Sequence, residues 1–229
     1  MVHSLSGVVP VGLFMVVQLW VHAKALAGPQ VYHDTLSGLA RLPGIVVLQT
    51  VILVSLVFHA GYGVVLAARA RYNIRRYPHS GNWVYTLQRV TGLLALTFIA
   101  LHAATVWLPA FLGWLPLADV YPTLVAKMST TTAGVPWVSL AYLVGIGACA
   151  FHLAVGLWTF GVRWGLTATR RARTWSGAVV AVLGLLVFCL GANTVLVLAT
   201  GWGPVGPAQR IDDATICDPA TGVGSAAPR

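Results

Sequence analysis

The sequence predicts an all-α integral membrane protein whose five transmembrane helices form one bundle. Of its 229 residues, 58% are hydrophobic and only 8% are charged, whereas roughly 25% are charged in an ordinary soluble domain. Crossing the hydrocarbon takes about 20 apolar residues. Five runs are long enough, at residues 4–27, 43–68, 83–112, 136–164 and 175–200. We expect residues 1–200 to form the transmembrane domain and 201–229 to form a tail outside it.

The two ends of the chain differ in composition. The first run has no basic segment before it, and the stretch AKALAGP that ends it is a weak cleavage site, so we expect it to be a retained helix. The tail is rich in Pro, Gly and Ala, which predicts an extended or disordered segment unless it packs on a partner. The three cysteines (Cys149, Cys189 and Cys217) indicate neither a disulfide framework nor a zinc site.

Positive charge is concentrated in two of the four connections. The connections between runs two and three and between runs four and five hold Arg69, Arg71, Arg75, Arg76, Arg163, Arg170, Arg171 and Arg173. The other two hold Lys24, Arg41 and Lys127. Because cytoplasmic loops carry the excess of Lys and Arg, we expect the N-terminus in the cytoplasm and the C-terminus outside. The net charge of +9 then reflects topology and lipid contact, and it does not indicate nucleic-acid binding.

Four of the apolar runs contain a histidine: His22, His59, His102 and His152. An ionisable side chain inside a membrane is costly and marks a functional site by default. His59 and His152 precede Arg69 and Arg163 by ten and eleven residues, which predicts that both rings lie about 15 Å from the inner basic rim.

The other two histidines form a second level, near the outer face. His22 lies six residues before Gly28, and His102 lies seven before Pro109. Because imidazole is a good iron ligand, the two levels predict two haem b groups, each with two axial histidines. A haem-free transporter or channel is the alternative, in which these rings only form hydrogen bonds between helices.

Four stretches resemble a known family. HSLSGVVPVGLF, FHAGYGV, LQRVTGLLALTFIALH and FHLAVGLWTFGVRWG are similar to the cytochrome b membrane anchor of succinate:quinone oxidoreductases, in the five-helix dihaem group. The resemblance implies a multi-pass protein of the cell inner (plasma) membrane that serves the respiratory chain and the tricarboxylic acid cycle. It would pass electrons between an iron–sulfur subunit and membrane quinone, usually menaquinone, and it would dock that subunit and a flavoprotein on its cytoplasmic face.

The resemblance also implies roles for the histidines. His59 and His152 match the ligands of the inner haem, and His102 matches a ligand of the outer haem. The family's first-helix ligand follows a Gly-aromatic-aliphatic motif by six residues, which from Gly12 leads to Gln18, and His22 comes four residues later. Residues at i and i+4 share a helix face, so His22 is the expected ligand. A lost or altered outer haem, with Gln18 and His102 as a polar pair, is the alternative.

Further site residues follow from the same resemblance. His3, Ser4 and Arg163 match partners of the inner haem propionates. His33 and Asp34, in the outer loop after the first helix, are candidates for proton exchange with quinone, although an ordinary polar loop would look the same. A dihaem cytochrome b subunit of a hydrogenase or a formate dehydrogenase is a further alternative.

Overall fold

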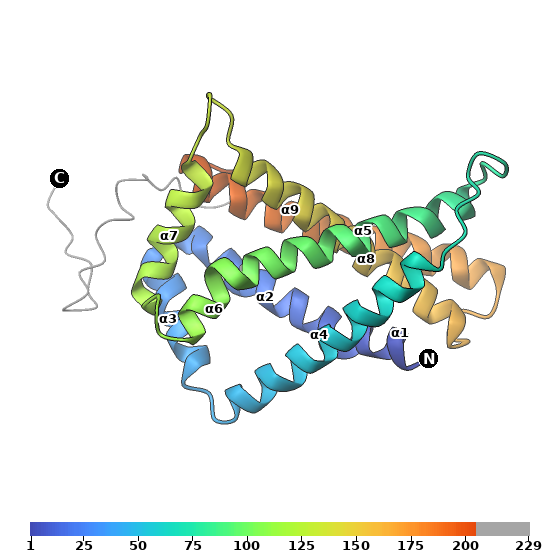
Figure 1. The fold of residues 1–229 in the computed structure, drawn as a ribbon, viewed down its shortest axis with the longest axis horizontal. Helices are drawn as coiled ribbons and strands as arrows, with labels where there is room; N and C mark the ends of the chain where they lie inside the picture. Colours follow the sequence, from blue (N-terminus) through green and yellow to red (C-terminus); the bar gives the residue numbers. More distant parts are fainter. Residues whose placement is uncertain (205–229) are drawn as a thin grey trace, which may run out of the picture. The chain divides into compact units, whose positions relative to one another are not determined.

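The computed structural model of the chain describes residues 1–204 and consists almost wholly of helices (Figure 1). Within these residues, five helical stretches are long and apolar enough to cross a membrane: Val2–Ala27, Ile45–Ala68, Ser80–Phe111, Trp137–Arg163 and Arg170–Thr200. The predicted all-α membrane fold with five spans is thus confirmed. The tail proposed for residues 201–229, with Cys217, lies almost entirely outside the described residues.

Two of the spans are built from several helical elements. The first comprises α1 (Val2–Ser6), a π-helix (Gly7–Gly12), α2 (Leu13–Ala23) and a 3-10 turn (Lys24–Ala27). The third comprises α5 (Ser80–His102), a π-helix (Ala103–Trp107) and α6 (Leu108–Phe111). Single α-helices form the other spans: α4 (Ile45–Ala68), α8 (Trp137–Arg163) and α9 (Arg170–Thr200).

The last span begins five residues before its predicted start at 175. The Thr169 hydroxyl accepts a hydrogen bond from the Ala172 N–H at 3.1 Å, which is the interaction of an N-cap. Arg170, Arg171 and Arg173 therefore lie in the first turn of α9, whereas the sequence predicted them in a loop. Hydropathy alone missed this turn because its residues are charged.

Two shorter helices lie outside the spans, where the sequence predicted loops. They are α3 (Pro29–Ala40) and α7 (Leu117–Ser129), and Figure 1 shows them side by side. Gly28 precedes α3 with φ 108° and ψ 167°, and Pro29 occupies the first turn, where a missing N–H costs nothing. The rings of Tyr32 and Tyr121 join the two helices, with centroids 5.9 Å apart. Their apolar faces were too short to be recognised in the sequence.

The chain forms two compact units. The first comprises Met1–Val17, Val46–Ile99 and Gly145–Phe188; the second comprises Gln18–Ile45, Ala100–Val144 and the described residues from Cys189 onward. Long helices contribute to both, since α8 gives residues 137–144 to the second unit and residues 145–163 to the first. The inner histidine pair belongs wholly to the first unit and the outer pair wholly to the second.

Each unit contains a π-helix next to a histidine. Gly7–Gly12 includes Pro10, which has no N–H to donate, and Ala103–Trp107 follows His102 directly. A π-turn changes which carbonyls are satisfied within a helix, and such turns are frequent at functional sites. In the second unit the Lys127 ammonium donates to the Thr105 carbonyl at 2.8 Å and so stabilises this turn.

We predict that Gly28→Ala destabilises the protein by about 1–3 kcal/mol, because its φ and ψ lie in a region that only glycine enters readily. The midpoint of thermal unfolding in detergent measures the effect. Gly38→Ala is the matched control: Gly38 lies within α3 and nothing lies within 4 Å of the point that its Cβ would occupy, so we expect a gain of about 0.5–1 kcal/mol there. Equal stability of the two variants would contradict the prediction.

Candidate functional site

The first unit brings His59 of α4 and His152 of α8 together. Their ring centroids are 6.2 Å apart, with an interplanar angle of 80°. A metal bound to both imidazoles through bonds of about 2 Å would hold the centroids about 6 Å apart. The observed centroid spacing therefore matches that of two imidazoles on one metal.

Hydrogen bonds set the orientation and the tautomer of both rings. His59 Nδ1 lies 3.0 Å from the His3 carbonyl oxygen, and His152 Nδ1 lies 2.9 Å from the Gln88 carbonyl oxygen. A carbonyl oxygen can only accept, so each Nδ1 carries the proton and donates it. Nε2 is then the nitrogen with the lone pair. Histidines that bind metals are held in this way, with the second nitrogen donating to a backbone carbonyl or a carboxylate.

Both rings also lie directly against glycine backbone. A Cβ placed on Gly92 of α5 would lie 2.8 Å from His152 Cε1, and one placed on Gly7 would overlap the His59 ring. Real Cβ atoms essentially never come within 3.0 Å of another group in this way. These two glycines thus allow the helices to approach the histidine rings.

Of the three predicted propionate partners, His3 lies directly against this pair. The His3 ring stacks on His59, with centroids 4.3 Å apart and an interplanar angle of 10°. The Ser4 hydroxyl accepts a hydrogen bond from the Trp164 indole N–H at 3.2 Å. Arg163, the third predicted partner, is the last residue of α8 and directly precedes Trp164 in the chain.

Several buried polar atoms of the first unit have no hydrogen-bond partner among the described residues. They include His3 Nδ1, Gln88 Oε1 and Arg89 Nε. Burying polar atoms without partners costs about 1–3 kcal/mol each. A cofactor that carries carboxylates would supply acceptors for the two nitrogen atoms, so this set fits a haem with its propionates.

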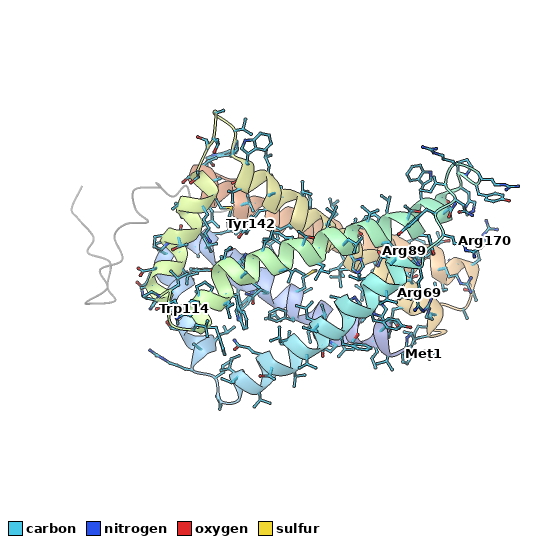
Figure 2. The ribbon with its side chains drawn as sticks, viewed as in Figure 1. Met1, Arg69, Arg89, Trp114, Tyr142 and Arg170 are labelled. Atoms are coloured by element: carbon cyan, nitrogen blue, oxygen red, sulfur yellow. The ribbon has the colours of Figure 1, made fainter. Side chains whose placement is uncertain are left out.

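The second unit brings His22 of α2 and His102 of α5 together. Their centroids are 5.2 Å apart, with an interplanar angle of 76°. The rings would have to separate by about 1 Å to share a metal through bonds of about 2 Å. Tyrosine hydroxyls contact both Nδ1 atoms: Tyr32 lies 2.9 Å from His22, and Tyr142 of α8 (labelled in Figure 2) lies 3.0 Å from His102.

Gln18, the alternative ligand, lies beside His22. Its amide nitrogen is 3.5 Å from His22 Nε2. The ring contact with His102 comes from His22, which agrees with the depth count from the sequence. Burial raises the pKa of the Tyr32 phenol, and Tyr142 adds to this effect, so Tyr32 is a neutral hydrogen-bonding group.

The two quinone candidates do not pair with each other. They lie in helix α3 and not in a loop, which corrects the sequence prediction. The Asp34 carboxylate accepts from the Gln30 amide at 3.0 Å and is exposed, whereas His33 Nε2 lies 3.3 Å from the Ser37 hydroxyl. His33 Nδ1 is buried without a partner. Their neighbour Tyr32, which no sequence pattern indicated, is the residue of α3 that reaches a histidine.

Each of the two sites supplies two imidazoles. Among the described residues, no three or more His, Cys, Asp or Glu side chains converge as they would around a metal held by protein alone. A porphyrin supplies four nitrogens in a plane and leaves two axial positions, which two imidazoles can fill. The donor set therefore fits haem.

The site residues that were not predicted from the sequence are of two kinds. Arg89 could have been predicted from the sequence, because a charged residue within a span is a functional candidate. It lies over the Tyr85 ring, 3.4 Å from its centroid, and donates to the Tyr85 carbonyl. Tyr32, Tyr142 and the two glycines had no such signal, since apolar spans commonly contain tyrosine and glycine.

The fold and these sites define an integral membrane protein that carries paired histidines of the cytochrome b type. The chain is 32% identical over 194 residues to the succinate dehydrogenase cytochrome b558 subunit of Bacillus subtilis (strain 168). The aligned residues make up 84% of this chain and 92% of that protein. No family model and no solved structure matches the chain. At this identity and coverage, the chain belongs to the family of succinate dehydrogenase cytochrome b subunits.

We predict that Gly92→Ala displaces His152, because the new Cβ would lie 2.8 Å from its Cε1. Overpacking of this kind costs about 1–3 kcal/mol. One low-spin haem signal should shift or disappear in the electron paramagnetic resonance spectrum of the purified protein. Gly61→Ala on α4 is the control, since nothing lies within 4 Å of that position. A normal spectrum for Gly92→Ala would show that the ring does not depend on this contact.

Proposed function

We propose that this chain binds two haem b groups and passes electrons between an iron–sulfur subunit and membrane quinone, as the anchor of a succinate:quinone oxidoreductase. One observation carries the proposal: two histidine pairs lie in separate units, and all four rings hold Nδ1 against an oxygen atom. The name of the relative favours a succinate dehydrogenase over a hydrogenase or formate dehydrogenase.

Each group of residues has a defined task in this proposal. His59 and His152 would hold the inner haem, and His22 and His102 would hold the outer haem. When bound, haem supplies one-electron chemistry at a potential tuned by its axial ligands and their hydrogen bonds. His3, Ser4 and Arg163 hold the inner propionates, and Arg89, with its unpaired buried Nε, is a further cation for them.

Partner subunits would dock on the cytoplasmic face. Arginine clusters follow α4 and begin α9. Because cytoplasmic segments carry the excess of Lys and Arg, these clusters indicate which face is cytoplasmic. In Figure 2, Met1, Arg69 and Arg170 are drawn toward the same end of the first unit, which agrees with a cytoplasmic N-terminus. The residues of this unit would therefore hold the haem nearer the iron–sulfur subunit, while the flavoprotein would carry out the succinate chemistry.

The quinone site would lie in the second unit, with menaquinone as the substrate. His33 is the better of the two candidates, because its Nδ1 is buried without a partner whereas Asp34 is exposed and bound to Gln30. A buried ring nitrogen without a partner is free to donate a hydrogen bond to a quinone oxygen. Asp34 can exchange protons with water.

We predict that a pyridine haemochrome assay finds two haems per chain in the wild type and one in His59→Ala, His152→Ala and His22→Ala. Loss of one axial histidine leaves the iron with one protein ligand and removes the orienting hydrogen bond with it. In the first two variants the remaining low-spin signal should be that of the outer haem.

Gln18→Ala is the matched control for His22→Ala, since the two residues lie one turn apart on α2. It should retain two haems. Loss of a haem in Gln18→Ala together with two haems in His22→Ala would assign the ligand to Gln18 and contradict the proposal. Fewer than two haems in the wild type would contradict the dihaem function itself.

We predict that His33→Ala with Asp34→Asn lowers quinone-linked turnover about 10²-fold or more, in line with the loss of a general acid or base. Succinate oxidation with a soluble dye, which bypasses the membrane site, should stay near normal. Gln30→Ala is the control, because it removes the partner of Asp34 and keeps both candidates. Normal turnover with quinone in the double variant would exclude the pair from the site.

A further inference from the structure

The two histidine pairs are held by different kinds of acceptor. Both rings of the first unit contact backbone carbonyls, those of His3 and Gln88. Both rings of the second unit contact tyrosine hydroxyls. This difference rests on four separate contacts of 2.9–3.0 Å, each within one unit.

The direction of the tyrosine contacts follows from the chemistry of the ligands. A phenol can donate or accept, so the contact alone does not fix the proton. A neutral imidazole that binds iron through Nε2 carries its proton on Nδ1. The phenol oxygens of Tyr32 and Tyr142 must then accept from His22 and His102.

The fold holds Tyr32 firmly in this position. Its side chain is 0% exposed, and its ring packs on Tyr121 of α7. The chain turns back at Gly28 and Pro29, where α3 begins. This turn brings Tyr32 to His22, which lies ten residues earlier in the sequence. A phenol is neutral at physiological pH, so Tyr32 acts as a dipole and not as a phenolate.

We infer that Tyr32 and Tyr142 are positioning residues that set the potential and the ligand geometry of the outer haem, a role that rests on the dihaem function proposed above. An acceptor on Nδ1–H makes the imidazole a stronger donor to iron. A stronger donor stabilises the oxidised iron and lowers the potential. Two side chains thus set the potential of the outer haem, whereas backbone carbonyls have the same role for the inner haem.

Potentiometric titration and paramagnetic resonance of the purified complex test this inference. In Tyr32→Phe and Tyr142→Phe the ring remains and the acceptor is lost. The potential of the outer haem, identified by its absence in His22→Ala, should rise. At a fixed ambient potential, its ratio of reduced to oxidised form should increase roughly tenfold, the order of magnitude expected for the loss of one hydrogen bond. The g-values of this haem should shift, and those of the inner haem should not.

Tyr62→Phe is the matched control. Its ring lies 5.3 Å from the His3 ring in the first unit, and its hydroxyl bonds neither inner histidine. Both haems should keep their potentials in this variant. A wild-type complex with fewer than two haems would overturn the dihaem function, whereas two haems with unchanged potentials in both tyrosine variants would overturn the tyrosine role alone. An equal shift of the inner haem would also overturn it, as a general disturbance of the fold.

A ring-fluorinated tyrosine at position 32 keeps the test decisive if Tyr32→Phe loses the outer haem. Fluorine preserves the shape of the ring and makes the phenol oxygen a poorer acceptor. The outer potential should then rise by a smaller amount with both haems retained. An unchanged potential with the fluorinated residue would overturn the inference.

Discussion

The structure depends on one constraint: an imidazole inside the hydrocarbon needs a hydrogen-bond partner that the lipid does not provide. His22, His59, His102 and His152 each meet it with an oxygen atom from a different helical element. These oxygens are those of His3, Gln88, Tyr32 and Tyr142. Because each contact joins two elements, it also fixes how they pack, and the requirements of the rings therefore shape each unit.

Close approach of helices to the rings requires glycine. Gly92 and Gly7 lie where a Cβ would strike the His152 and His59 rings, so the backbone itself forms one wall of the inner site. The π-helix at Gly7–Gly12 begins at one of these contacts. Outward-facing positions need no such fit, and large apolar side chains such as Val47, Val57 and Leu186 are more than half exposed there, as expected against lipid.

The assignment of His22 shows how sequence and structure complement each other. Counting along the helix placed His22 at the depth of His102, whereas the family motif led to Gln18. In the structure the His22 and His102 rings lie against each other, and Gln18 contacts His22 from one turn away. Depth could be estimated because the rise per residue is limited in every kind of helix, although a 3-10 turn (Lys24–Ala27) and a π-helix (Ala103–Trp107) lie within the two counted stretches.

The sequence by itself determined the membrane class, the five spans and the pairing of the histidines, because hydropathy and helical rise depend only on local composition and spacing. It did not reveal helices α3 and α7, the start of α9 at Arg170 or the separate partners of His33 and Asp34. Only the tertiary structure decided which oxygen holds each imidazole. The Tyr32 contact, for example, spans a turn at Gly28 and depends on packing against Tyr121, and such contacts between elements leave no periodic signal in the chain.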